Sequence, residues 1–289
     1  MMVQLHNPVI CPVCSYSKKV RVFLTLVNGS YFECNSCEFI FFLGSSSQED
    51  NVAASSNYSD SYWLQELAAA QDRAFGVSLA RAAEVFILSR RHIETFLDIG
   101  TGPGLFLDAI DRYLPDSETT FLGVELFPPK LEFQTSHPGY RVGWLDQFED
   151  NSIDGGMCIE VLEHLLPIQV KELFQVLHSK ATNGATFIFN TGLVEYVKNE
   201  DPTYLDPVQR GHISIWSVRA IEKLLSDMGW SISSIPNRSW AFLAEKGTKK
   251  DEDLRDRIWK TLPENIAALS GKSHSKLLYL LGRDSLRAI

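Results

Sequence analysis

Residues 96–104 read FLDIGTGPG, an apolar run with one aspartate, followed by glycine at every second position. Such a run is typical of a buried strand, and glycines directly after it let the chain turn sharply with no Cβ in the way. A strand that turns in this way into a helix presents backbone N–H groups and a helix N-terminus to a ligand. The stretch therefore predicts a ligand site at the carboxyl end of a parallel strand.

Strand-like and helix-like segments alternate after this turn, which predicts an α/β fold with a parallel sheet covered by helices on both faces. The segments are TFLDIG, LFLDAIDRYL, TTFLGVEL, PPKLEFQTS, YRVGWL, IDGGMCIEV, IQVKELFQVLHSK, ATFIFNTG and SVRAIEKLLSDMG. The stretch WSISSIPNRSWAFLAEKG then holds two extended pieces separated by a short turn. Because this turn is too short for a crossover, the last strand is predicted to be antiparallel.

Four parts of the chain differ in pattern. Residues 1–44 alternate short extended pieces around two cysteine turns, which predicts a small β-ribbon. Residues 45–92 begin without hydrophobic periodicity, as a linker does, and continue with helical spacing. We expect the α/β core at 93–247 and a helical extension at 248–289.

The formal net charge of −9 disfavours nucleic acid and anionic membranes as general partners, although a local basic patch is compatible with it. No apolar stretch approaches the ~20 residues of a membrane span, and the start lacks the features of a secretory signal. We therefore expect a cytoplasmic protein without membrane partners. The sequence does not indicate an oligomeric state.

The glycine turn reads Asp98-x-Gly100-x-Gly102-x-Gly104, and it lacks the third glycine of the dinucleotide fingerprint G-x-G-x-x-G. An ordinary tight turn can use the same residues. A second feature is Glu125, at the end of the next predicted strand. A carboxylate at that edge of the sheet can accept hydrogen bonds from both hydroxyls of a ribose.

From about Thr95 to Gly247 the chain resembles the class I S-adenosylmethionine-dependent methyltransferases. The stretches that carry the resemblance are LDIGTGPG, GVEL, SIDGGMCIEVLEHL, ATFIFNTG and GHISIWS. The resemblance implies a Rossmann-like, seven-stranded sheet with an antiparallel last strand. It also implies S-adenosylmethionine as the cofactor.

The resemblance further implies roles for individual residues. Asp98 and the three glycines would hold the methionine moiety, and Glu125 would bind the ribose. Asp146 and Gln147 would flank the adenine, although a loop aspartate is also commonly just solvated. Glu160, in the EVLEHL segment, is counted with the cofactor-binding residues.

Methyl transfer from a sulfonium requires mainly that an acceptor atom be aligned and lose its proton. His164 and His212 follow the fourth and fifth predicted strands, and an ordinary imidazole pKa of about 6.5 suits a base at neutral pH. Both are candidate general bases, with His212 preferred and a fall in rate expected at acidic pH. Structural or cofactor-contacting roles are the alternative, above all for His164. The long connection 193–210 is predicted to cover an acceptor, with Tyr196 and Tyr204 as the candidate residues, and a surface loop without function is the alternative.

Four of the five cysteines form the pattern C-x2-C-x19-C-x2-C. They are Cys11, Cys14, Cys34 and Cys37. Two turns spaced in this way can present four thiolates to one tetrahedral ion, which predicts a structural Zn²⁺ without an open position. Two disulfides are the alternative, and a cytoplasmic location disfavours them.

Similar ribbons precede the core in sugar C-methyltransferases of deoxysugar pathways and in certain ribosomal-RNA guanine methyltransferases. Three functions follow from this: methyl transfer to a small molecule such as a sugar or a natural-product intermediate, methyl transfer to RNA, and a non-catalytic adaptor that binds S-adenosylmethionine. The acidic charge favours the first function over the second. The intact glycine turn and acidic strand end favour it over the third. The acceptor and the methylated atom are not identified by the sequence.

Overall fold

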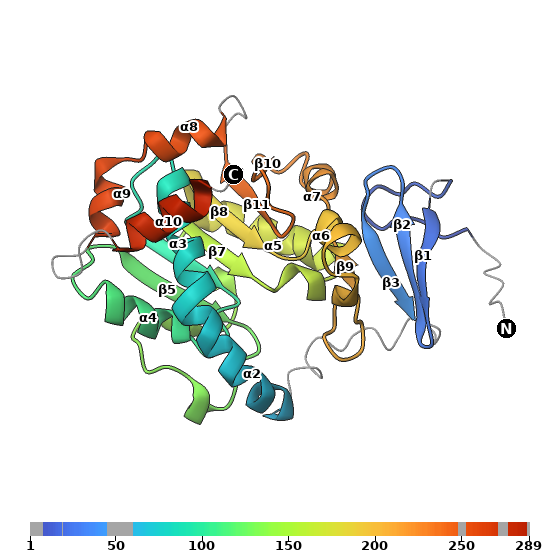
Figure 1. The fold of residues 1–289 in the computed structure, drawn as a ribbon, viewed down its shortest axis with the longest axis horizontal. Coiled ribbons are helices and arrows are strands. Elements are labelled where there is room, and N and C mark those ends of the chain that lie inside the picture. Colours follow the sequence, from blue (N-terminus) through green and yellow to red (C-terminus); the bar gives the residue numbers. More distant parts are fainter. Residues whose placement is uncertain (1–7, 19, 45–59, 248–252, 271–276, 288–289) are drawn as a thin grey trace.

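The computed structural model describes residues 8–18, 20–44, 60–247, 253–270 and 277–287 (Figure 1). The linker predicted around residues 45–59, and parts of the C-terminal extension, lie outside these ranges. The described residues form a seven-stranded sheet in the order β10-β11-β8-β7-β4-β5-β6 and a four-stranded sheet in the order β1-β2-β3-β9. The fold class predicted from the sequence is confirmed.

The large sheet forms the centre of the molecule. Its strands are β4 (Thr95–Ile99), β5 (Thr120–Glu125), β6 (Tyr140–Val142), β7 (Ile153–Ile159), β8 (Ala181–Asn190), β10 (Trp230–Ser234) and β11 (Ala241–Lys246). The strands β4 to β8 pair in parallel, whereas β11 runs antiparallel to both β8 and β10. The antiparallel last strand is therefore confirmed.

Side chains on the large sheet alternate between two hydrophobic clusters, as the period of two in a strand requires. Phe96 and Met157 belong to one cluster, and their neighbours Leu97 and Cys158 belong to the other. Helices cover both faces, as Figure 1 shows. They are α2 (Asp60–Arg73), the π-helix η2 (Ala74–Ser78), α3 (Leu79–Leu88), α4 (Leu105–Tyr113), α5 (Pro167–Lys180), α6 (Val194–Asn199), α7 (Val218–Leu224), α8 (Leu254–Trp259), α9 (Pro263–Ala268) and α10 (Leu277–Arg287). No helix in the described ranges is both long and apolar enough to cross a bilayer.

The C-terminal helices pack on the face that α3 covers. A Cβ at Gly282 of α10 would lie 2.7 Å from the Cβ of Ala83, so glycine lets α10 and α3 approach closely. Arg257 of α8 makes a bidentate, buried ion pair with Glu245 of β11, with nitrogen–oxygen distances of 2.8 and 3.0 Å. The C-terminal segment therefore belongs to the hydrophobic core of the α/β domain.

One predicted helix is wrong. Residues 128–136, with the sequence PPKLEFQTS, form only the short 3-10 helix η3 (Leu131–Phe133). The chain leaves the helical conformation at Gln134, and the backbone N–H of Thr135 then donates to the carbonyl oxygen of Pro103 at 2.8 Å. This hydrogen bond holds the segment against the glycine turn and takes the place of further helical hydrogen bonds.

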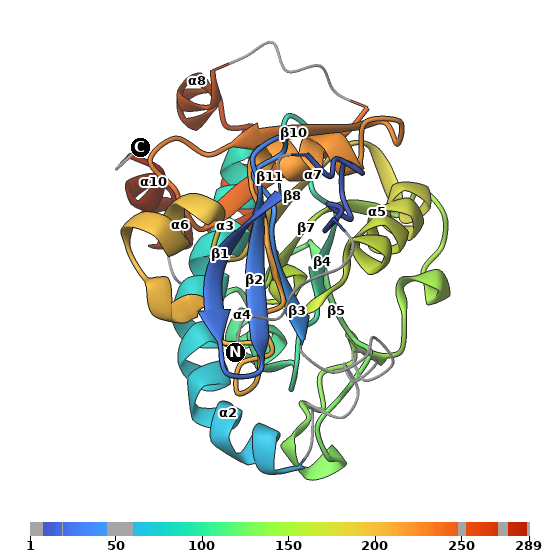
Figure 2. The same ribbon diagram turned by 90° about the vertical axis from the view of Figure 1, so that its right-hand side faces the viewer.

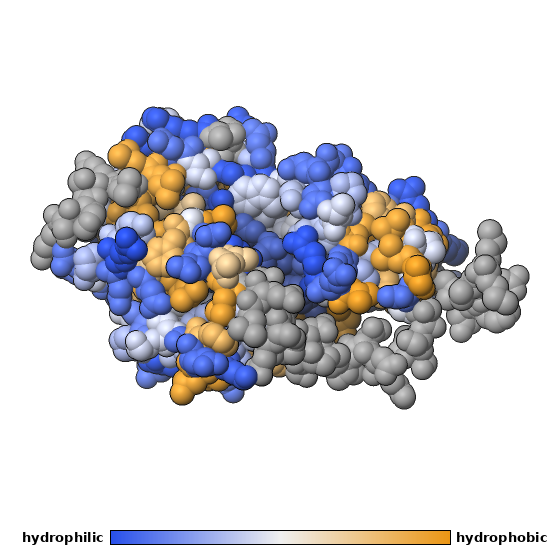
Figure 3. Space-filling view, turned by 60° about the horizontal axis from the view of Figure 1, so that its bottom comes forward, coloured by the Kyte–Doolittle hydropathy of each residue, from blue (hydrophilic) through white to orange (hydrophobic). Residues whose placement is uncertain are grey.

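The ribbon consists of β1 (Val20–Leu26), β2 (Gly29–Cys34) and β3 (Ile40–Gly44), and it is completed by β9 (Ser214–Ile215) from the core. Figure 2 shows its strands side by side in front of the core. Hydrophobic residues gather on part of the ribbon surface in Figure 3. Inside, the ribbon meets the core through hydrophobic residues, since Phe32 and Phe39 share a buried cluster with Trp216. Because β3 pairs with β9, the ribbon and the core share a sheet.

Candidate functional site

A cavity of about 300 Å³ lies at the carboxyl ends of β4, β5 and β7. Its wall comes from separate parts of the chain. They are the glycine turn, the end of β5, residues 143–145, residues 159–161 with His164, residues 209–210 with His212, and the helices α2 and η2. Convergence of strand ends at one edge of a parallel sheet is the reason that these segments meet.

The glycine turn needs glycine for two reasons. Gly100, Gly102 and Gly104 have φ angles of 72°, 60° and 79°, in the left-handed region that other residues rarely adopt. A Cβ at Gly100 would lie 2.5 Å from Cγ2 of Val161, and one at Gly104 would lie 2.4 Å from Cγ2 of Thr135. Gly100 and Gly102 line the cavity, whereas Gly104 lets η3 and β6 pack beside the start of α4.

Two carboxyl groups lie behind this turn, and both line the cavity. The Glu125 carboxylate accepts hydrogen bonds from the backbone N–H groups of Gly102 at 2.7 Å and Phe127 at 2.9 Å. Burial raises the pKa of Glu125, and burial raises the pKa of Asp98 to about 7, with a further contribution from the charge of Glu125. A cationic ligand would favour the ionised form of both groups.

Asp146 and Gln147, expected at the adenine, lie on the 3-10 helix η4 (Leu145–Gln147) with exposed side chains. The structure does not bring them into the cavity wall. Gln147 Nε2 instead donates to the carbonyl oxygen of Trp144 at 2.8 Å. Trp144 and Leu145 line the cavity in their place. The aromatic residue two positions before the aspartate was the sequence signal for this wall.

Glu160 lies at the end of β7 in an uncommon conformation, with a φ of 54°. Its carboxylate accepts hydrogen bonds from Asn190 Nδ2 at 3.1 Å and from the hydroxyl of Tyr204 at 3.2 Å. Burial raises its pKa to about 8, and the charge of Glu163 adds to the effect. Backbone strain of this kind concentrates at functional sites, which agrees with the position of Glu160 in the cavity wall.

The structure brings His164 and His212 together, with ring centroids 5.1 Å apart. His212 is 3% exposed, and its Nδ1 lies 2.8 Å from the carbonyl oxygen of Tyr204. Because a carbonyl only accepts, Nδ1 carries the proton and Nε2 holds the lone pair. Burial lowers the pKa of His212 to about 3, with the neighbouring His164 as the second cause, so the ring is neutral at physiological pH.

The connection 193–210 forms α6 and the 3-10 helix η6 (Pro202–Tyr204). Tyr204 is buried, and its ring stacks on His212 with centroids 4.2 Å apart. Tyr196 packs edge-on against Tyr204 at 5.6 Å. This connection therefore holds His212 and Glu160 in place, and only its last residues, Gln209 and Arg210, line the cavity.

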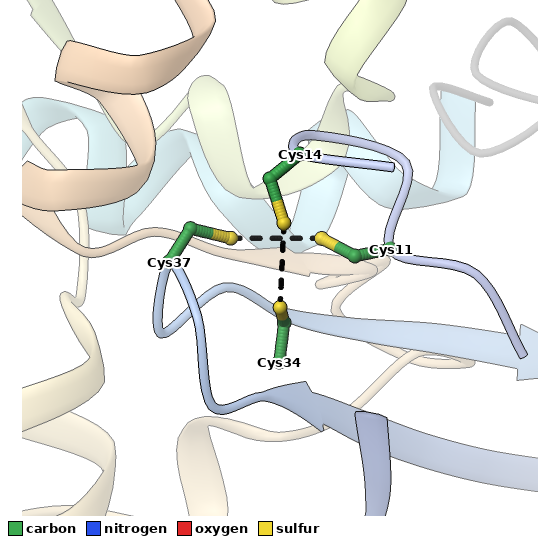
Figure 4. A group of neighbouring side chains, drawn as sticks. All are labelled: Cys11, Cys14, Cys34 and Cys37. Atoms are coloured by element: carbon green, nitrogen blue, oxygen red, sulfur yellow. Dashed lines mark hydrogen bonds between the residues drawn. The ribbon is translucent and has the colours of Figure 1, made fainter. Parts of the chain in front are cut away.

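The four N-terminal cysteines point toward one centre from two turns, as Figure 4 shows. The Sγ atoms of Cys11 and Cys37 are 3.5 Å apart, as are those of Cys14 and Cys34. Four sulfurs around one Zn²⁺ at about 2.3 Å would be about 3.8 Å apart, whereas a disulfide requires about 2.05 Å. All four thiols are free. Their geometry fits a tetrahedral ion and not the alternative of two disulfides.

The comparisons with known proteins agree with this fold. A family model described as a methyltransferase domain matches residues 62–235. One similar solved structure is a SAM-dependent methyltransferase from Archaeoglobus fulgidus, with 19% identity, 64% of this chain and 99% of that chain covered, and a TM-score of 0.45. Another is RosA, the N,N-8-amino-8-demethyl-D-riboflavin dimethyltransferase from Streptomyces davawensis, with 20% identity, 65% and 57% covered, and a TM-score of 0.47. No protein among the curated ones matches the sequence.

Proposed function

Because the chain belongs to the family of methyltransferase domains, we propose that it transfers the methyl group of S-adenosylmethionine to a small-molecule acceptor. The observation that carries the proposal is one cavity at the edge of the sheet, which is lined by the glycine turn and Glu125 and also by His164 and His212. A cofactor at the first group and an acceptor at the second would lie in the same cavity. The net charge of −9 favours a small molecule over RNA as the acceptor.

The proposed cofactor site uses the residues at the glycine turn. Backbone groups of Gly100 and Gly102 and the Asp98 carboxylate would hold the cationic methionine moiety, and Glu125 would bind the ribose. Glu160 lies in the same wall. The adenine would contact Trp144 and Leu145, which line the cavity. Asp146 and Gln147 do not line it. Asp98 supports this assignment because its buried carboxyl would be ionised most readily next to a positive ligand.

The acceptor would lie at the opposite end of the cavity, beside His164 and His212. S-adenosylmethionine supplies a methyl group that is already activated by the sulfonium. The protein would align the acceptor atom and assist the loss of its proton. Our proposal from the sequence is that Nε2 of His212 accepts this proton, with His164 as the alternative. Because the pKa of His212 is lowered to about 3, its ring is neutral at physiological pH and Nε2 is free of a proton. The same low pKa makes His212 a weak base.

We further propose that the ribbon binds one structural Zn²⁺ through Cys11, Cys14, Cys34 and Cys37. Four thiolate ligands would close the coordination sphere, so this ion would take no part in the reaction. The ribbon would instead support the cavity, since the hydroxyl of Tyr31 donates to the carbonyl oxygen of His212 at 2.5 Å. Residue 44 would therefore end the ribbon in the sequence, although the ribbon and the core contact each other in the fold.

The test is calorimetry of the purified full chain with S-adenosylmethionine. We expect binding at one site and no competition by NADH. Heat precipitation of the protein should release bound S-adenosylmethionine or its demethylated product, together with a small-molecule acceptor. Mass spectrometry of the supernatant would identify them. Copurified RNA would favour the RNA methyltransferase. Absence of any affinity for S-adenosylmethionine would refute methyl transfer.

A further inference from the structure

Glu163 is a buried carboxylate that the proposed reaction does not use. Its side chain is 0% exposed, and neither of its oxygens makes a hydrogen bond of normal geometry among the described residues. Glu160, Thr191 and Tyr204 surround it. Burying a carboxylate without a partner costs several kcal/mol unless a proton or a cation compensates for the lost water. Burial raises the pKa of the Glu163 carboxyl, so this group holds either a proton or, where one binds, a cation.

Two imidazoles, those of His164 and His212, lie near this carboxylate. His164 Nε2 lies 3.9 Å from Oε1 of Glu163. His164 Nδ1 lies 3.2 Å from the carbonyl oxygen of Gly211, and His212 Nδ1 lies 2.8 Å from that of Tyr204. A backbone carbonyl beside Nδ1 fixes the ring orientation and leaves Nε2 as the ligand atom, which is the usual arrangement of histidines that bind a metal ion.

The spacing of the three groups fits one shared ion. One ligand atom from each of Glu163, His164 and His212 lies within 4.8 Å of the others. Ligands at about 2.1 Å from a common ion are about 3.0–3.5 Å apart. The pair Glu163 and His164, at 3.9 Å, would therefore have to close by less than 1 Å, and a pair at the 4.8 Å limit by about 1.3 Å. The observed distance of 3.9 Å is too long for a hydrogen bond.

We propose that Glu163, His164 and His212 bind one divalent first-row cation such as Mn²⁺ at the acceptor end of the cavity. Two imidazoles and a carboxylate suit such ions, whereas the four thiolates of the ribbon suit Zn²⁺. The cation's use in catalysis rests on the proposed methyl transfer, but its binding does not. Glu160, held by Asn190 and Tyr204, lies beside the site and is available as a further oxygen ligand.

The remaining coordination positions face the substrate. His164 and His212 line the cavity, whereas Glu163 lies behind them. An acceptor oxygen that binds the cation loses its proton more readily, because the cation stabilises the oxyanion. The hydroxyl proton then passes to water, the new oxygen–carbon bond forms, and the methyl–sulfur bond breaks to leave the neutral thioether. With the cation bound, Nε2 of His212 is occupied as a ligand, so water replaces this histidine as the base proposed above.

The experiment is a titration of Mn²⁺ into the full chain, with the ribbon zinc retained, followed by the electron paramagnetic resonance signal of free Mn²⁺. No cofactor or acceptor is added. We expect about one Mn²⁺ per chain. The variants Glu163→Gln and His212→Ala should weaken binding at least tenfold. The control His92→Ala removes an exposed histidine that pairs with Glu94, and it should bind as the wild type does.

Thermal unfolding keeps the test independent of folding defects. Without metal, Glu163→Gln should unfold at the same or a higher temperature than the wild type, because it replaces a fully buried carboxyl group with a neutral amide of similar shape. Added Mn²⁺ should raise the midpoint of the wild type and not that of Glu163→Gln. Failure of the wild type to bind Mn²⁺, or equal binding by Glu163→Gln, overturns the site. Failure to bind S-adenosylmethionine would refute only the methyl transfer.

Discussion

The molecule holds two groups of potential metal ligands that differ in origin and in access. We call Cys11, Cys14, Cys34 and Cys37 the ribbon cluster, and Glu163, His164 and His212 the cavity cluster. The ribbon cluster comes from two neighbouring turns and offers one kind of ligand on all sides. The cavity cluster comes from segments on either side of β8 and opens toward a cavity. The first can only hold the fold together, whereas the second can take part in chemistry.

The two clusters are nevertheless connected by the backbone. The N–H of Phe42 in β3 donates to the carbonyl oxygen of Ile213 at 2.9 Å, and the N–H of Ile213 donates to that of Glu163 at 2.9 Å. Phe39 also packs on Trp216, with ring centroids 4.5 Å apart. The ribbon therefore contacts the segment that carries His212, because β9 pairs with β3 and directly follows that segment. The following predictions test whether the ribbon cluster is structural, whether the cavity cluster is catalytic, and whether the contact between ribbon and core stabilises the fold.

The largest effect is expected for Cys14→Ser. Binding of structural Zn²⁺ contributes about 10–16 kcal/mol in small zinc modules, so loss of one thiolate should release the ion and loosen β1 to β3. The α/β core should stay folded. Metal analysis and hydrogen exchange of the ribbon measure both effects. The control is Cys158→Ala, a buried cysteine of β7 outside the cluster, which should keep its zinc. A reduced wild-type sample without zinc would contradict the prediction.

His212→Ala should lower turnover by about 10²–10⁴-fold, whether the imidazole is the base or a ligand of the cation. Affinity for S-adenosylmethionine should stay nearly unchanged, because the cofactor residues lie at the glycine turn. Calorimetry and single-turnover rates measure the two quantities, with His92→Ala as the control. Near-normal turnover in His212→Ala would make this histidine a packing residue. The fall in rate expected near pH 6.5 from an ordinary imidazole is wrong for this histidine. Burial lowers the pKa of His212 to about 3, so protonation of its ring should lower the rate only near that pH.

Glu125→Ala should weaken binding of S-adenosylmethionine by about 1.5–3 kcal/mol, the usual contribution of hydrogen bonds to a charged group. The substitution also removes the acceptor of the Gly102 N–H. The matched control is Glu94→Ala, a largely exposed carboxylate whose loss should leave the affinity unchanged. Equal affinity in Glu125→Ala would remove the ribose assignment and leave the cavity cluster unaffected.

Affinity for S-adenosylmethionine should depend on pH through Asp98, whose pKa burial raises to about 7. A cationic ligand favours the carboxylate, so below about pH 7 binding must expel a proton and weaken by about tenfold per pH unit. Without ligand the sign is opposite. The protonated carboxyl contributes stability that is fully present below its unfolded pKa and is lost as pH rises through about 7. Asp98→Asn should reduce both dependences, with a remainder from Glu125 and Glu160, whose pKa values burial also raises. A flat wild-type profile would contradict the assignment.

The smallest effect is expected for Tyr31→Phe, which tests the connection directly. It removes the hydrogen bond from the Tyr31 hydroxyl to the carbonyl oxygen of His212, at 2.5 Å in the wild type. We expect the free energy of unfolding to fall by about 0.5–1.5 kcal/mol, with the zinc retained. Urea denaturation measures the change. Tyr16→Phe, at a half-exposed tyrosine of the ribbon, is the control. An unchanged stability would show that strand pairing alone connects the two clusters.

Predictions from the sequence were correct where the signal is local. The alternation of segments and the short turn before β11 were enough for the sheet and its antiparallel strand. The glycine turn and Glu125 lie together as expected, because parallel strands end at one edge. The segment 128–136 failed as a helix because a tertiary hydrogen bond, from Thr135 to Pro103, decided its end. Helical spacing alone carries no information about such a contact.

By itself, then, the sequence determined the ribbon cluster, the glycine turn and the order of strands and helices, since each depends on residues close together in the chain. Only the tertiary structure decided that Glu163 lies buried beside His164 and His212, that Trp144 replaces Asp146 in the cavity wall, and that β9 joins the ribbon. It also decided the pKa of His212. Burial and the convergence of distant segments set these features, because desolvation depends on which elements pack together and not on which residues are neighbours in sequence.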